Sequence, residues 1–270
     1  KYTPVAAAVF AVGGLLGDFE VALALVAAGS AACVRLLGAD AFDRTTGRVA
    51  VVALLCSPLF LLTSSAFLAY APTTLFNLVF AVAYVRTVRR DSLRWGVVAG
   101  VAVGLAFFSR PYTAVLFASP FVAHACYSLV VARDPRVLVR YVAIGVPGLL
   151  FVLVHFGYNA VVTGDALLFP YAAFGPRDGI GFGERALLGY ERTYTPALAA
   201  EATVEAVSML VSRWGPAGVV GTLLAVVGAA ATFHDGLPRP DGRSLPDREV
   251  ALLLAAVVPV VVLGEAYFWG

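Results

Sequence analysis

The sequence is poor in charged residues. Asp, Glu, Lys and Arg make up 13% of its 270 residues, whereas a soluble domain carries about 25%. The formal net charge of +2 is too small to indicate a nucleic-acid partner. Hydrophobic residues make up 60% of the chain, and the mean hydropathy is +0.87. The composition therefore excludes an ordinary soluble domain and predicts an integral membrane protein.

Cysteine is scarce as well. Cys33, Cys56 and Cys126 all lie in apolar runs without a CxxC pair, which indicates neither a disulfide framework nor a zinc site. The sequence contains no N-x-[ST] glycosylation acceptor, no Walker A sequence and no signal-peptide pattern. It begins at Lys1 and stops at Gly270, directly after an apolar run. We therefore expect residues 1–270 to be one truncated transmembrane domain of a longer protein.

Long apolar runs dominate what is present. A helix needs about 20 apolar residues to cross a bilayer, and eight segments approach or reach that length. The predicted fold class is all-α, a polytopic membrane helical bundle of about eight spans plus interfacial helices. The predicted spans are residues 19–37, 49–68, 73–85, 95–108, 113–131, 139–162, 217–233 and 250–268. Residues 4–16 are too short to span and are predicted to lie at the interface.

Two residue types predict local features of this bundle. Gly96, Gly100 and Gly104 form a GxxxGxxxG run, which lets a neighbouring helix approach closely. Prolines inside the predicted spans predict kinks, because proline removes a helical hydrogen bond. These prolines are Pro58, Pro120, Pro147 and Pro259.

The arginines predict the orientation. Cytoplasmic turns carry an excess of Lys and Arg, and counting spans places four arginine-rich turns on one face. Their arginines are Arg35, Arg44 and Arg48; Arg86, Arg89, Arg90 and Arg94; Arg133, Arg136 and Arg140; and Arg239, Arg243 and Arg248. We predict that this face is cytoplasmic and that the protein lies in the cell membrane.

The opposite face carries most of the other polar residues outside the spans. Its longest part is a predicted extracytoplasmic loop over residues 163–215, which ends in an amphipathic helix over 201–214. Polar groups that converge from separate turns are how a membrane site is usually built. The candidate substrate-binding residues on this face are Tyr2, Tyr70, Tyr158, Asn159, Asp165, Tyr171, Arg177, Asp178, Glu265 and Tyr267.

Structural roles compete with binding roles at these positions. Asp165 and Asp178 lie in sequences that favour turns, and the tyrosines suit an interfacial aromatic belt as well as sugar stacking. A functional role is the favoured interpretation of Glu265, because placing a carboxylate inside an apolar run costs free energy. His124 and His155 lie within spans and are interpreted as packed side chains.

The layout restricts the chemistry. The cytoplasmic turns reach only about 15 residues, far below the size of a folded nucleotide-binding domain. An enzyme of this layout must therefore work on the outer face, with an activated lipid-phosphate-linked substrate. Lys1 and Arg110 are the candidate ligands of the donor phosphate. The structural alternative for Lys1 is an ordinary terminal charge, and the alternative for Arg110 is a side chain that snorkels to the membrane interface. No cofactor is indicated with certainty, and a divalent metal stays open.

Four stretches, in this order, resemble the GT-C glycosyltransferases of the aminoarabinose-transferase and protein-O-mannosyltransferase type. Residues 1–4 (KYTP) with the following apolar stretch are similar to the K-x-P motif and juxtamembrane helix, and residues 107–111 (FFSRP) to the F-L-T-R-P turn. Residues 158–171 resemble the loop with Y-N, T-G and P-Y, and residues 265–270 resemble the start of the aromatic C-terminal motif.

The resemblance implies transfer of a sugar from a polyprenyl-phosphate carrier to a glycan, lipid or protein acceptor on the extracytoplasmic face. It also implies an inverting displacement, with an acidic general base and basic groups on the leaving phosphate. The family's catalytic carboxylate belongs to a first outer loop that would precede Lys1. The general base is therefore unassigned, and the fragment alone is expected to be inactive.

A transporter or flippase for a lipid-linked glycan is the alternative function. Such a protein should show paired repeats and charged residues near the span centres. Here no repeat is visible and the span centres are almost uncharged, which favours the enzyme. A non-catalytic scaffold, the third candidate, would not need the clustered outer polar residues.

Overall fold

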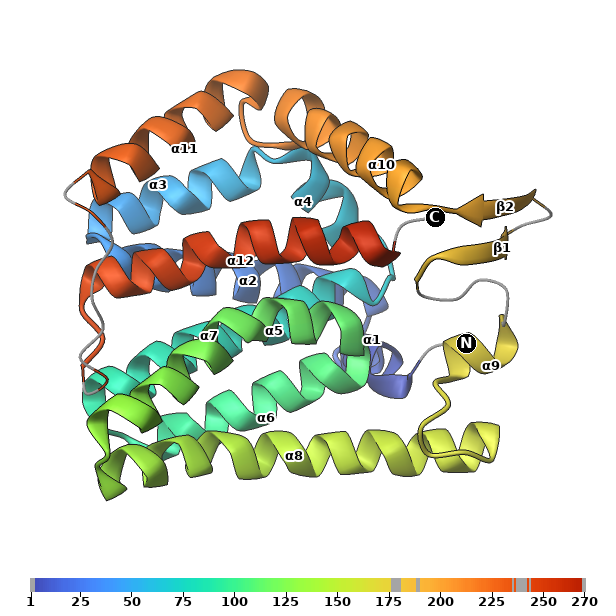
Figure 1. Ribbon diagram of the computed structural model, residues 1–270, viewed down its shortest axis with the longest axis horizontal. Helices are drawn as coiled ribbons and strands as arrows, with labels where there is room; N and C mark the ends of the chain where they lie inside the picture. Colours follow the sequence, from blue (N-terminus) through green and yellow to red (C-terminus); the bar gives the residue numbers. More distant parts are fainter. Residues whose placement is uncertain are drawn as a thin grey trace.

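The computed structural model describes residues 3–175, 181–187, 190–234, 236, 242 and 244–268 (Figure 1). It is a bundle of helices with one short β-hairpin, which confirms the predicted all-α polytopic fold class. The helices are α1 Pro4–Leu15, α2 Phe19–Ala41, α3 Arg44–Leu55, α4 Pro58–Ser64, α5 Tyr70–Arg90, α6 Leu93–Ser109, α7 Pro111–Ala132, α8 Pro135–Thr163, α9 Pro170–Phe174, α10 Pro196–Met209, the π-helical turn η1 Leu210–Trp214, α11 Gly218–Phe233 and α12 Asp247–Phe268. The strands are β1 Gly183–Leu187 and β2 Tyr190–Tyr194.

Five of the described helices, α2, α5, α7, α8 and α12, are long and apolar enough to cross a membrane. Two bent pairs raise the number to as many as seven: α3 with α4, bent by 69°, and α10–η1 with α11, bent by 104°. All eight predicted spans are thus largely helical, but two of them contain or adjoin a sharp bend. The predicted span at 95–108 corresponds to α6, which has 17 residues and is shorter than an ordinary span.

The two bends meet in space. Pro58 begins α4, because its fixed φ suits the first turn of a helix and breaks the one before it. The hydroxyl of Ser57 at this break donates a hydrogen bond of 2.9 Å to the carbonyl oxygen of Trp214, the last residue of η1. The other three prolines predicted to cause kinks lie inside continuous α-helices: Pro120, Pro147 and Pro259.

The glycine run of α6 packs against α8, as predicted. A Cβ atom at Gly104 would lie 2.6 Å from Cβ of Phe151, and one at Gly100 would overlap the carbonyl oxygen of Ile144 even more deeply. Gly104 contacts Phe151, and the earlier Gly100 contacts the earlier Ile144, so α6 and α8 run parallel. Their C-terminal ends therefore lie at the same end of the bundle, which we call the loop end (Figure 1).

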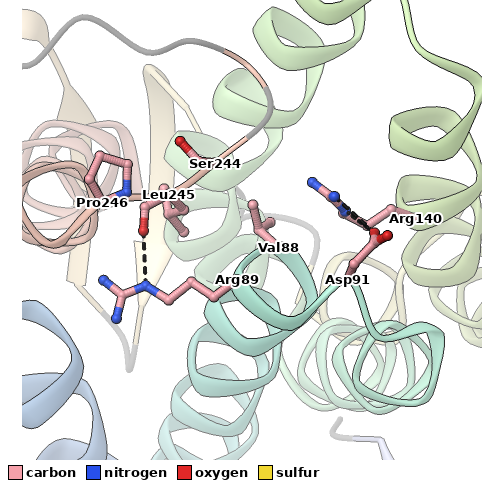
Figure 2. Close-up of a pocket in the computed structure, with 7 residues that line it drawn as sticks. All are labelled: Val88, Arg89, Asp91, Arg140, Ser244, Leu245 and Pro246. Atoms are coloured by element: carbon pink, nitrogen blue, oxygen red, sulfur yellow. Dashed lines mark hydrogen bonds and ion pairs between the residues drawn. The ribbon is translucent and has the colours of Figure 1, made fainter.

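The opposite end holds arginine-rich turns tied by ion pairs. Arg89 pairs with Asp247 at 2.7 Å and donates from Nε to the carbonyl oxygen of Leu245 at 2.9 Å. Arg140 pairs with Asp91 at 2.9 Å. Figure 2 shows Arg89, Leu245 and the pair of Arg140 with Asp91; these residues line a pocket of about 400 Å³. Here the side chains hold turns together, far from the residues predicted to bind substrate.

The described residues of the predicted loop over 163–215 include regular structure. It contains α9, the hairpin of β1 and β2, and α10, which begins before the predicted amphipathic helix and runs into η1. The strands pair antiparallel, with Gly183 opposite Tyr194. The hairpin docks on the end of α12, where the hydroxyl of Tyr194 donates to the carbonyl oxygen of Ala266 at 2.6 Å.

Candidate functional site

Arg110 forms the turn between α6 and α7 at the loop end. Its extended backbone, with φ −145° and ψ 89°, separates the two helices because Pro111 must begin a new one. The Arg110 guanidinium lies 3.9 Å from the ring centroid of Tyr70, the first residue of α5. This cation–π contact holds the half-buried guanidinium at the rim of the bundle.

Hydroxyl groups of neighbouring residues hold the Arg110 turn in place. The hydroxyls of Ser109 and Thr73 are hydrogen-bonded at 2.7 Å, and the hydroxyl of Thr3 donates to the Ser109 carbonyl oxygen at 3.3 Å. The start of α1 is therefore attached to the Arg110 turn. Lys1 and Tyr2 directly precede Thr3 but lie outside the described residues, so their predicted roles stay predictions.

Glu265 approaches Arg110 from α12. The hydroxyl of Tyr112 donates to the carbonyl oxygen of Gly264, which fixes this part of α12 beside the start of α7. Glu265 is half-buried, and Arg110 lies near enough to act on the charge of its carboxyl group. The cation, the carboxylate and the Tyr70 ring therefore come from three separate elements.

An aromatic layer of the hairpin covers the end of α12. The Phe182 ring lies 5.3 Å from that of Tyr267, and the Arg185 guanidinium lies 4.4 Å from the ring of Tyr194. Arg185 also donates from Nε to the carbonyl oxygen of Gly181 at 3.0 Å. Burial raises the pKa of the Tyr194 phenol, and the positive charge of Arg185 opposes that rise. The sequence analysis did not select these hairpin residues.

The end of α8 contributes a second group of predicted residues. Asn159 is fully buried and donates from Nδ2 to the carbonyl oxygen of Ala166 at 3.1 Å. The Tyr158 ring lies 5.7 Å from that of Phe108. The carboxylate of Asp165 accepts a hydrogen bond from the Leu167 amide at 2.9 Å, which gives it the turn role weighed above.

The structure therefore sorts the predicted residues into two neighbouring groups at the loop end, with the end of α6 between them (Figure 1). Arg110, Tyr70, Glu265 and Tyr267 belong to the elements around the α6–α7 turn, whereas Tyr158, Asn159, Asp165 and Tyr171 belong to the end of α8 and the segment that follows. Arg177 and Asp178 lie outside the described residues. Within the described ranges, no three His, Cys, Asp or Glu side chains are grouped to hold a metal ion.

The sequence was compared with known proteins. Residues 3–159 match the model of the dolichyl-phosphate-mannose-protein mannosyltransferase family, which is more than half of the chain. The matched part includes α1 to α7 and most of α8, and therefore the Arg110 turn. No curated protein and no solved structure matches the chain.

Proposed function

The chain belongs to the dolichyl-phosphate-mannose-protein mannosyltransferase family, and we propose that it moves a sugar from a polyprenyl-phosphate carrier to an acceptor on the extracytoplasmic face. Membership makes it a membrane glycosyltransferase that uses a lipid-linked sugar donor. The acceptor class we propose is a glycan, a lipid or a protein. The proposed location is the cell membrane, with the loop end outside.

The position of Arg110 carries the proposal. Its guanidinium rests on Tyr70 at the rim of the bundle, and no carboxylate of the described residues lies within ion-pair distance of it. A guanidinium that keeps its N–H donors available binds phosphate through two parallel hydrogen bonds. Glu265 on α12 does not occupy these donors, because it forms no ion pair with Arg110. Arg110 therefore suits the headgroup phosphate of a lipid that reaches the site from within the bilayer.

In the proposed reaction, an acceptor oxygen attacks the anomeric carbon as the bond from that carbon to the carrier phosphate breaks. The electron pair of the broken bond leaves with the phosphate, where Arg110, joined by Lys1, neutralises the developing charge. A carboxylate takes the proton of the acceptor. Among the described residues, no carboxylate is assigned to this role.

The proposed orientation in the membrane is supported by the arginine-rich end of the bundle, which lies opposite the loop end. Arg89 and Arg140 lie at the end where the arginine-rich turns gather, and such turns face the cytoplasm. The Arg110 turn lies at the other end of α6, and α6 begins next to Asp91, the partner of Arg140. This arrangement supports an extracytoplasmic site.

Replacement of Arg110 tests the proposal. In the parent protein reconstituted in liposomes, with polyprenyl-phosphate mannose as the donor, Arg110→Ala should lower the rate of sugar transfer at least ~10-fold, the factor that corresponds to loss of about 1.4 kcal/mol. Arg110→Lys should retain part of the rate, because the charge remains while the planar fork is lost. Arg90→Ala, an exposed arginine at the opposite end, is the matched control. An unchanged rate in Arg110→Ala would remove Arg110 from the site.

A further inference from the structure

Two buried polar side chains at the loop end carry atoms for which the described part of the chain offers no hydrogen-bond partner. His155 and Asn159 lie one turn apart on α8, with exposed fractions of 1% and 0%. Among the described residues, neither ring nitrogen of His155 nor Oδ1 of Asn159 has a hydrogen-bond partner. A buried polar atom left unpaired costs about 1–3 kcal/mol, so buried polar groups in native proteins are nearly always satisfied. These three atoms indicate a partner that the described residues do not supply.

Aromatic rings surround His155. The ring centroids of Phe107, Phe108 and Phe169 lie 5.4, 5.4 and 5.3 Å from that of the imidazole. Small-molecule sites are typically lined by apolar and aromatic side chains, with a few polar groups that fix the orientation of the ligand. Neither His155 nor Asn159 belongs to an ion pair of the described chain. The surroundings therefore suit a neutral ligand that carries hydroxyl groups.

The segment over 164–169, which we call the strap, covers His155 and Asn159. It lies between α8 and α9 (Figure 1). Gly164 turns the chain with a left-handed φ of 84°, and the Phe169 ring then covers the imidazole. Side chains of α8 hold the strap down: Asn159 donates to the Ala166 carbonyl oxygen, and Thr163 donates to that of Leu168 at 3.1 Å. The other side-chain hydrogen bonds of the strap are local, to Thr163 or within the strap itself, so Asn159 and Thr163 are the residues of α8 that tie it to the bundle.

We infer that His155 and Asn159 form the polar floor of a carbohydrate-binding pocket, which the strap closes in this structure. When the strap opens, Phe169 leaves the imidazole and the Asn159 amide becomes available. A pyranose then supplies hydroxyl donors to Oδ1 of Asn159 and both donors and acceptors to the two ring nitrogens of His155. Its apolar C–H faces pack on the phenylalanine rings.

The inference rests on the proposed function, because it assigns to this pocket the sugar that the enzyme transfers or extends. Phe108 connects the pocket to Arg110, the residue proposed to bind the carrier phosphate. The Phe108 ring contacts His155, and Arg110 follows two residues later in the chain. A sugar in the pocket therefore lies on the α8 side of the turn that holds the carrier phosphate. The sugar can come from the donor lipid or from a glycan acceptor.

Binding measurements on the full chain in lipid nanodiscs test the pocket. The probes are polyprenyl-phosphate mannose, polyprenyl phosphate without a sugar, and methyl α-mannoside. His155→Phe removes both ring nitrogens but keeps an aromatic ring, and Asn159→Leu removes the amide. Leu153→Ala, at a position of α8 that is 57% exposed, is the matched control.

We expect His155→Phe and Asn159→Leu to lower the affinity for polyprenyl-phosphate mannose at least ~10-fold and to leave the affinity for polyprenyl phosphate unchanged. The melting temperature of His155→Phe should equal or exceed that of the wild type, because two unsatisfied buried nitrogens are removed. Asn159→Leu also loses the hydrogen bond to the Ala166 carbonyl oxygen, so this variant is judged by binding alone. A merely structural histidine would instead show a lower melting temperature and unchanged binding. If only the affinity for methyl α-mannoside falls, the pocket holds the acceptor sugar, which also supports the inference.

Three results separate the two proposals. Wild-type affinities for all three probes in both variants would overturn the pocket, while the phosphate role of Arg110 would stand. Equal losses for the lipid with and without sugar would also overturn it, because the variants would then act on the phosphate or on the fold. Failure of the wild-type chain to bind either lipid would overturn the proposed function, and with it the pocket.

Discussion

The glycine seam between α6 and α8 makes a prediction that can be worked from the structure. A Cβ atom at Gly100 would overlap the backbone carbonyl oxygen of Ile144, and a backbone atom moves only with its helix. Gly100→Ala therefore forces the two helices apart along the seam. Helices in a membrane associate through close van der Waals packing, and a gap of 0.5–1 Å forfeits roughly a quarter to a half of each contact energy.

The expected cost follows from this overlap. Inserting a methyl group into a well-packed interface typically destabilises by about 1–3 kcal/mol. Alanine also has a higher helix propensity than glycine, by about 1 kcal/mol, and this gain must be measured separately. Gly145→Ala on α8 is the matched control, because nothing lies within 4 Å of the Cβ atom that it would add.

Thermal unfolding in detergent measures the difference between the two variants. A chain of this size loses roughly 2–4 °C in melting temperature per kcal/mol, so Gly100→Ala should melt about 2–12 °C below Gly145→Ala. Donor affinity should fall as well, because the seam places the Arg110 turn beside the end of α8. If Gly100→Ala melts no lower than Gly145→Ala, the parallel packing of these helices is refuted.

Two further predictions concern orientation and pH. In a chain without its native cysteines, Leu167→Cys, at a position that is 70% exposed, should react with a membrane-impermeant maleimide from outside the cell, and reaction only after permeabilisation would reverse the proposed topology. Asp43 caps α3, and its hydrogen bonds with Thr46 lower the pKa of the Asp43 carboxyl. A lowered folded-state pKa gives stability that is present above the unfolded pKa of about 4 and lost as the pH falls through the folded value. Asn caps a helix at any pH, so Asp43→Asn should make the loss of folding stability at acidic pH less steep. An equally steep loss in the variant would contradict the role given to Asp43.

Much of the fold could be read from the sequence, because a bilayer leaves few solutions for an apolar chain. Spanning segments must be helices of about 20 residues, so apolar runs predicted α2, α5, α7, α8 and α12. The arginine turns predicted which helix ends share a side. The kink at Pro58 was predicted from the proline, but its partner was not, and the 104° bend before α11 was not predicted, since a break depends on what satisfies the freed backbone groups. At Ser57 that partner is Trp214, which is 157 residues away.

The hairpin of β1 and β2 shows a second limit. Five residues on each side of a short turn are weak strand signals, and the sequences GERAL and YERTY gave little to separate them from an irregular loop. Docking on α12 stabilises them through Tyr194 and Arg185. The pairing was therefore decided by a surface that local sequence does not reveal.

The site divides in the same way. The sequence by itself determined that Arg110 stands alone at a turn between two helices, since Arg-Pro after an apolar run permits little else, and that Asn159 belongs to the same end. Only the tertiary structure decided that the Tyr70 ring contacts the Arg110 guanidinium and that Glu265 lies near it on α12. It also decided that His155 is buried among aromatic rings with no hydrogen-bond partner in the described ranges, because these relations depend on contacts between helices distant in sequence, and no local pattern encodes them.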